Sequence, residues 1–255
     1  MKRNMFALTA LSFLLGFALE AKEFSFATPE SWQTPAALQK KGNSLLVAGQ
    51  KGLVGKRLIK VPEGASLKIT GTFRAAPGSA KNTVYLGFKA YDINRNEIRH
   101  VNIAPVAGTE TVLEQPAPAG EYSFLIKDGS KWKKGYNIVW GAKKDLSDLP
   151  NYNILGRIAK VEKAGNNWKV TLAARLKKPL PKGTILRLHS AGGYMYYVFM
   201  STIPGAKDPR TNSIKKIWPG VRYVRFLVLA NWKGGKNAVL EMIDPKVTVT
   251  EAVKK

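Results

Sequence analysis

Alternation of apolar and polar residues, repeated along most of the chain, is the feature that most limits how this sequence can fold. In "SLKITGTFRA", Leu67, Ile69 and Phe73 fall on one side, and lysine, threonine and arginine fall on the other. Successive side chains of a strand point to opposite faces of a sheet, so a period of two predicts half-buried strands. The nearly continuous apolar run 221–232 is typical of a strand near the centre of a sheet. Frequent Gly and Pro turn signals separate these segments, and the pattern predicts an all-β, antiparallel β-sandwich of jelly-roll type.

The length and composition suit one folded unit. The chain has 255 residues, of which 45% are hydrophobic, enough for a single sandwich core. No linker tract or fixed-period repeat divides it, so we expect one domain over 22–255. The alternation is weakest at 141–153, where we expect a loop, and the proline-containing stretch 198–220 is also irregular. Long loops between strands are common places for binding sites.

The first twenty residues have the pattern of a secretory signal peptide. A basic start, "MKRN", precedes the apolar run "MFALTALSFLLGFAL", and small residues offer cleavage after Ala21 or after Ala18. The alternative, an uncleaved anchor, requires a longer apolar run. We expect 1–21 to be removed, leaving no transmembrane segment. The chain has no cysteine, which favours a secreted or periplasmic bacterial protein.

The charge of the chain predicts an anionic partner. Lys and Arg number 41 against 17 Asp and Glu, a formal net charge of +24. Such an excess favours encounters with polyanions. An exported protein is a poor candidate for nucleic-acid binding, and the sequence contains no recognised nucleic-acid motif. We therefore expect a polysaccharide, an anionic one in particular, as the partner. The sequence leaves the oligomeric state open.

Three stretches resemble the jelly-roll carbohydrate-binding modules, which have a galactose-binding-like β-sandwich. They are "LVAGQKGLVGKRLIKVPEGASLKITGTFRA" (46–75), "VYLGFKAYDINRNEI" (84–98) and "VRYVRFLVLANWKGGKNAVLEMIDPKVTVTEA" (221–252), about a third of the chain. The resemblance implies a sandwich with a large extension or insertion around 128–218, which has no counterpart in those modules. It also implies a structural Ca²⁺ at Asp244, with Glu23 or Glu30 as further oxygen donors. The alternative is that Asp244 only begins a turn with Pro245.

The segment "LRLHSAGGYMYY" (186–197) is the first candidate for a ligand site. A hairpin turning at Gly192-Gly193, or one residue earlier, would place four polar and aromatic side chains on one face because side-chain direction has period two. These are Arg187, His189, Tyr194 and Tyr196. Arg can hold a carboxylate or sulfate bidentately, and Tyr can stack on a sugar. The alternative is the solvated side of an ordinary hairpin.

Tryptophans among lysines are the second candidate. Trp132 stands between Lys131 and Lys133, with Tyr136 close behind, as expected for an indole that stacks on a charged ligand. The alternative is an edge strand whose tryptophan is covered by lysine stems. Trp218, beside two lysines in the irregular region, is a further candidate. Trp140 ends an apolar run, so we expect it in the core.

Catalysis has little support in the residues. A polysaccharide lyase could use Arg187, His189 and Tyr194 or Tyr196 for charge neutralisation and proton transfer, but the known lyase motifs are missing. Facing carboxylate pairs for glycoside hydrolysis are also missing. The sequence therefore predicts a secreted, non-catalytic carbohydrate-binding protein. The alternatives are a lyase on a jelly-roll scaffold and an envelope-associated structural protein held by its charge.

Overall fold

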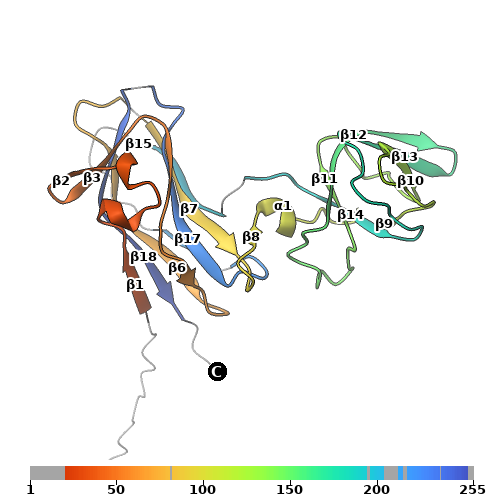
Figure 1. Cartoon of the computed structure of the whole chain (residues 1–255), viewed down its shortest axis with the longest axis horizontal. Helices are drawn as coiled ribbons and strands as arrows, with labels where there is room; N and C mark the ends of the chain where they lie inside the picture. The colour runs from red at the N-terminus through yellow and green to blue at the C-terminus, as the bar shows by residue number, and fades with distance from the viewer. Residues whose placement is uncertain are drawn as a thin grey trace, which may run out of the picture.

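Antiparallel β-sheets build both parts of this molecule (Figure 1). The computed structural model describes residues 21–80, 82–193, 196–203, 212–214, 217–235 and 237–251. The predicted signal peptide therefore lies outside the described residues except for Ala21, which begins the first strand. The all-β, jelly-roll prediction is confirmed.

The first part, which we call the sandwich lobe, stacks two sheets. One sheet has the order β16-β6-β18-β3-β2, with β1 also paired to β18. The other has the order β15-β7-β17-β4, with β5 also paired to β17 and β8 to β7. The strands of the first sheet are β1 (Ala21–Ser25), β2 (Gln39–Lys41), β3 (Ser44–Ala48), β6 (Ser66–Ala75), β16 (Asn212–Ile214) and β18 (Val239–Thr250). Those of the second are β4 (Lys51–Val54), β5 (Ile59–Lys60), β7 (Asn82–Tyr91), β8 (Glu97–Ile98), β15 (Tyr196–Ile203) and β17 (Tyr223–Trp232).

The sandwich core follows from the alternation in the sequence. Leu67, Ile69 and Phe73 of β6 are fully buried between the sheets, as are alternate residues of β7 and β18. Strand β17 lies between β7 and β4 and is buried on both faces, as its apolar run predicts. Two 3₁₀ turns, η1 (Pro29–Ser31) and η2 (Pro35–Ala37), connect β1 to β2.

The second part, the insert lobe, is formed by the chain between β8 and β15. Its strands are β9 (Thr111–Val112), β10 (Ser123–Ile126), β11 (Asn137–Trp140), β12 (Ile154–Ala164), β13 (Asn167–Leu172) and β14 (Ile185–His189). They pair in the order β10-β13-β12-β11-β14-β9, and the sheet closes on itself where Leu113 bridges Ile126. A separate hydrophobic core fills this lobe, formed by residues such as Phe124, Ile126, Trp132, Val170, Leu186 and Leu188.

The insertion is thus present, and its strands run from Thr111 to His189; β15 and β16 already belong to the sandwich lobe. The short helix α1 (His100–Ile103) lies where the chain leaves the sandwich lobe (Figure 1). The predicted domain limits, 22–255, stay a prediction, although the described strands enclose two cores. Within the described ranges no helix has the length and apolar character needed to cross a membrane.

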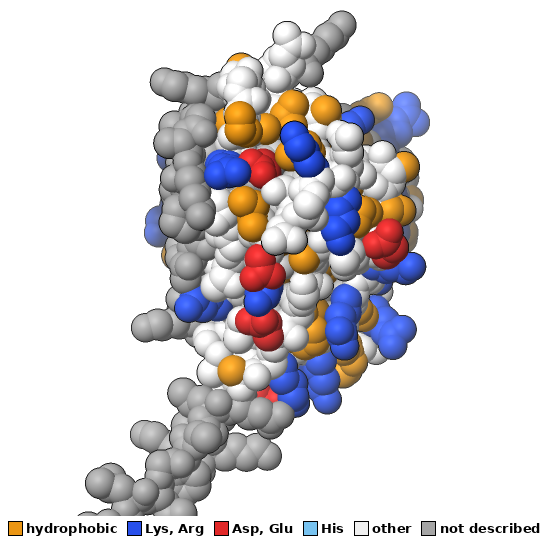
Figure 2. Space-filling view, turned by 90° about the vertical axis from the view of Figure 1, so that its left-hand side faces the viewer, with side chains coloured by type: hydrophobic (Ala, Val, Ile, Leu, Met, Phe, Trp, Pro, Cys, Tyr) orange, Lys and Arg blue, Asp and Glu red, His pale blue; other side chains and the backbone are white. Residues whose placement is uncertain are grey.

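The outer surface of the sandwich lobe carries charges of both signs. Figure 2 shows one face of it, where Lys and Arg side chains are spread among Asp and Glu. In the sandwich lobe, several charged side chains are matched in ion pairs, including Arg74 with Glu241 at 2.6 Å and Lys246 with Glu23 at 3.1 Å. The positive charge therefore does not form one uniform field on this face.

Candidate functional site: a buried polar junction between the lobes

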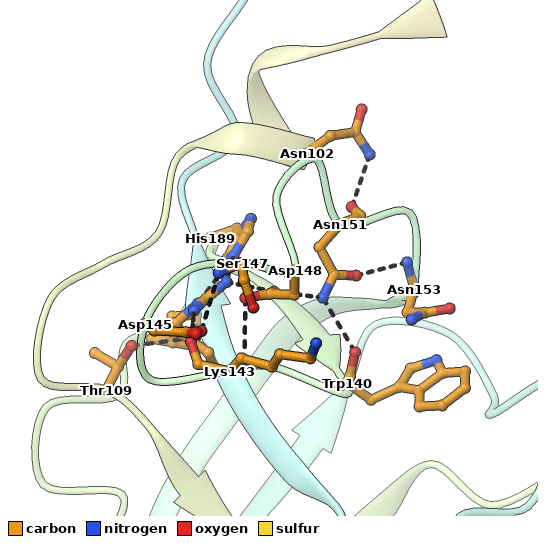
Figure 3. Close-up of polar contacts among 12 residues, drawn as sticks. Asn102, Thr109, Trp140, Lys143, Asp145, Ser147, Asp148, Asn151, Asn153 and His189 are labelled. Atoms are coloured by element: carbon orange, nitrogen blue, oxygen red, sulfur yellow. Dashed lines mark hydrogen bonds and ion pairs between the residues drawn. The ribbon is translucent and has the colours of Figure 1, made fainter. Parts of the chain in front are cut away.

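The densest polar cluster lies where the insert lobe meets α1 (Figure 3). Strand β14 supplies Arg187 and His189, both 0% exposed. Because side chains alternate along a strand, Leu186 and Leu188 point into the insert core, and Arg187 and His189 point the other way. There the loop 141–153, which we call the junction loop, covers them. Its weak alternation is explained, because it wraps over a polar cluster and belongs to no sheet.

Arg187 is held on every side of its guanidinium group. Nη2 donates to Oδ2 of Asp148 at 2.7 Å, Nη1 donates to the carbonyl of Lys143 at 3.1 Å, and Nε donates to Nε2 of His189 at 3.1 Å. A buried arginine is stable only when its charge and its donors are matched. This side chain is therefore a structural group in the interior, and it is not available to a ligand from solution.

His189 is fixed as a neutral ring. Its Nδ1 lies 2.6 Å from the carbonyl oxygen of Val101, which can only accept, so Nδ1 carries the proton and Nε2 accepts from Arg187. Burial lowers the pKa of His189, and the neighbouring Arg187 charge lowers it further. The ring therefore stays uncharged at neutral pH and connects β14 to α1.

Asp148 balances the charge of Arg187. Its carboxylate accepts from Lys143 N at 3.1 Å and from Asn151 Nδ2 at 2.8 Å, besides Arg187. Burial opposes ionisation, but these hydrogen bonds and the charge of Arg187 outweigh it and lower the pKa of Asp148. The carboxylate stays ionised and closes the junction loop around Arg187.

The same loop contacts α1 and reaches the sandwich lobe. Asn151 donates its backbone N–H to the carbonyl of Asn102 at 2.8 Å, and the Asn102 side chain donates back to the Asn151 carbonyl at 3.0 Å. Tyr152 donates its hydroxyl to Oδ2 of Asp92, just beyond β7, at 2.9 Å. Burial and this hydrogen bond raise the pKa of Tyr152. These contacts, with Arg187, His189 and Asp148, form what we call the lobe junction.

Close packing completes the lobe junction. Gly220, which precedes β17, has φ +73° and lies against Pro150 so tightly that a Cβ there would overlap the Pro150 ring. Between β14 and β15, Gly192 lies directly against the His100 ring. His100 in turn contacts the Trp218 ring, with the ring centroids 6.1 Å apart. Trp218 also packs on the sandwich core, so it joins the two parts of the chain.

The predicted hairpin at 186–197 is wrong. Strand β14 pairs with β11 and β9, whereas β15, which begins at Tyr196, pairs with β7 of the sandwich lobe. The Gly192-Gly193 pair carries the chain from one lobe to the other and does not turn it back. Tyr194 and the side chain of Tyr196 lie outside the described residues. Of the predicted aromatic partners of Arg187 and His189, Tyr196 therefore belongs to a different sheet.

The burial of two tryptophans differs from what the sequence predicted. Trp132, expected at a ligand surface, is 5% exposed, packs in the insert core and donates Nε1 to the Thr109 carbonyl at 2.9 Å. Trp140, expected in the core, does pack against the insert core but is only half-buried, and it lies beneath Lys178, whose Nζ is 3.7 Å from the ring centroid. Ile185, next to the β14 partner of Trp140, Leu186, is 46% exposed.

Lys133 and Tyr136 do lie together. They line a cavity of about 400 Å³ with Lys131, Val106 and Leu188, while Trp132 faces away into the core. Two residues of the predicted set are therefore neighbours, but without the indole face that was to bind a ring.

Two of the residues predicted to supply oxygen ligands for calcium lie next to a lysine. Glu23 and Asp244 both lie near Nζ of Lys246, at 3.1 and 3.0 Å, so an ammonium group stands between them. Asp244 also has φ +47°, within β18 at the point where the pairing with β6 shifts register between Ile243 and Lys246. Among the described residues no group of three or more His, Asp or Glu is placed to hold a metal. Calcium binding at Asp244 stays a prediction.

Comparison with known proteins gives few matches. No family model and no curated protein matches the chain. Among solved structures, it matches VP17, a capsid protein of bacteriophage P23-77, with 11% identity and a TM-score of 0.17, over 92% of this chain and 97% of that one. It also matches the complex of the two major capsid proteins VP16 and VP17 of that phage, with 11% identity and a TM-score of 0.16, over 92% of this chain and all of the other.

The predicted function is corrected. The two matched structures are of capsid proteins. The physical reason lies in the predicted ligand residues, because Arg187, His189 and Trp132 are enclosed by protein. The prediction of a carbohydrate-binding protein with an anionic polysaccharide partner is therefore wrong, whereas secretion stays a prediction. The lyase alternative required the same enclosed Arg187 and His189.

Proposed function

We propose that this chain is a non-catalytic structural protein that holds two β lobes as one rigid body. The observation that carries the proposal is the closure of the lobe junction. Arg187 and His189, the residues best suited to acid–base or anion chemistry, are 0% exposed and use their polar atoms to bind Asp148, Lys143 and Val101.

The contacts of the lobe junction restrict movement of one lobe relative to the other. A buried polar network with all its partners present fixes the junction loop on β14 and α1, since displacing the loop would leave a charged group unpaired in the interior. The junction loop so fixed contacts α1 at Asn102 and the sandwich lobe at Asp92 and Gly220, three points separated along the chain. Three separate contacts restrict rotation about any single one. Export of the chain, expected from its first residues, remains part of the proposal.

Rigidity can be measured between spin labels. The chain has no cysteine, so Lys68→Cys in β6 and Lys169→Cys in β13 introduce the only thiols, both at exposed positions. Double electron–electron resonance between labels on these thiols should give one narrow distance distribution. Adding Asn151→Ala, which removes the side-chain bonds to Asp148 and Trp140, should broaden it.

The control is Asn153→Ala, in the same loop but exposed, which should leave the distribution narrow. A broad distribution in the unmodified junction would refute the rigid-body proposal. So would an unchanged, narrow distribution in the Asn151→Ala protein.

A further inference from the structure

An apolar groove lies on the insert lobe beside Trp140. Its walls are formed by Trp140, Ala142, Pro179, Leu180, Pro181 and Ile185, and its volume is about 450 Å³. Ile185 is 46% exposed, and both prolines are exposed. Apolar side chains gathered in an open groove mark sites of interaction more often than isolated exposed residues do.

The walls are fixed before anything binds. Trp140 donates its backbone N–H to the Asn153 carbonyl at 3.0 Å and accepts from Asn151 Nδ2 at 3.2 Å, so the lobe junction supports this wall from behind. Across the groove, Leu180 and Ala117 exchange two backbone hydrogen bonds of 2.9 Å. A preformed groove lowers the ordering cost that a ligand must overcome.

Exposed lysines are frequent in the segments that form the groove. The two segments carry five of them, which we call the lysine rim: Lys143, Lys144, Lys177, Lys178 and Lys182. Lys178 lines the groove itself, with Nζ 3.7 Å from the Trp140 ring centroid. The acids of the same segments do not balance them, since Asp148 is paired with Arg187 and Asp145 is a single carboxylate. An apolar floor with a cationic rim is complementary to a ligand that carries an apolar side chain between carboxylates.

We propose that this groove docks an extended acidic segment of a partner protein, with one apolar side chain against Trp140 and Asp or Glu side chains facing the lysine rim. A second copy of this chain is disfavoured, because it presents the same lysines and a net charge of +24. The proposal rests on the groove and its rim and is independent of the rigidity of the lobes.

Peptide selection tests the groove without a known partner. Random dodecapeptides displayed on phage are selected against the full chain, with counter-selection against the Lys178→Glu, Ile185→Ser double variant. Enriched sequences should hold an apolar or aromatic residue flanked by at least two acidic ones. A synthetic peptide from this set should bind about tenfold more weakly to each single variant, which is the effect of losing one good contact.

Matched controls separate the groove from general charge and hydrophobicity. Lys169→Glu makes the same charge change on the exposed side of β13, and Ile93→Ser removes an isoleucine that is 64% exposed on the sandwich lobe. Both should change the peptide affinity less than twofold. Near-ultraviolet circular dichroism checks that all four variants keep their packing.

Three results would overturn the proposal. The first is no enrichment over counter-selection. The second is enriched peptides without acidic residues, or binding that Lys178→Glu and Ile185→Ser leave unchanged. The third is binding of laurate in the groove with no peptide binding, which would assign the groove to a small amphiphile.

Discussion

Removing Arg187 is the sharpest perturbation of the lobe junction. In the Arg187→Met protein, Asp148 keeps its bonds to Lys143 N and Asn151 but loses its counter-charge, while its side chain is only 6% exposed. Leaving one partner of a buried ion pair without the other costs about 3–5 kcal/mol. Asp148→Leu leaves the Arg187 charge unmatched and should cost a similar amount.

The double variant distinguishes an ion pair from two independent losses. Removing both charges leaves no unpaired ion, so Arg187→Met with Asp148→Leu should be less destabilising than the sum of the single changes by at least about 2 kcal/mol. Urea unfolding at pH 7.5, followed by near- and far-ultraviolet circular dichroism, gives the three free energies of unfolding. Arg157→Met, at an exposed position of the same lobe, is the control and should cost about 1 kcal/mol or less.

Additive free energies across the cycle would refute the reasoning, because they would mean that Arg187 and Asp148 do not stabilise each other. Single variants that each lower the free energy of unfolding by less than about 1 kcal/mol would do the same, since an enclosed, unpaired charge destabilises the protein by more than that.

Two further predictions concern the same region. Because burial lowers the pKa of folded His189, the unfolded chain takes up a proton at a higher pH than the folded chain does. The stability that the neutral ring contributes is therefore present above the ordinary histidine pKa of about 6.5 and should be lost as the pH falls below it. Urea titrations should show this slope, and His189→Gln should flatten it. Gly220→Ala should destabilise the protein by more than about 2 kcal/mol, because the new Cβ would collide with Pro150. Gly42→Ala, also at positive φ but with open space, should cost only the backbone strain of about 1 kcal/mol. Equal shifts in the thermal unfolding temperature of the two variants would contradict this.

The burial of Trp132 and Trp140 is an example of what the sequence could not predict. Three lysines around Trp132 suggested a surface loop, but one buried acceptor, the Thr109 carbonyl, lets the indole lie inside while the neighbouring lysines point out. Trp140 follows buried residues of β11, yet it lies at the end of the strand, where the wall of the lobe opens into the groove. Local composition pointed the opposite way at the two sites, because it does not show the position of each residue on its sheet.

What the sequence by itself determined is the class of fold and most of the sandwich core. Alternation and turn residues act over a few positions, so they identify β6, β7 and β17 and the faces they bury. Only the tertiary structure shows which strands β14 and β15 pair with, and therefore which residues surround Arg187 and His189. Arg187 and His189 look the same in sequence whether they face water or a covering loop. The loop that covers them, and the β7 strand that receives β15, lie tens of residues away along the chain, beyond the reach of any local pattern.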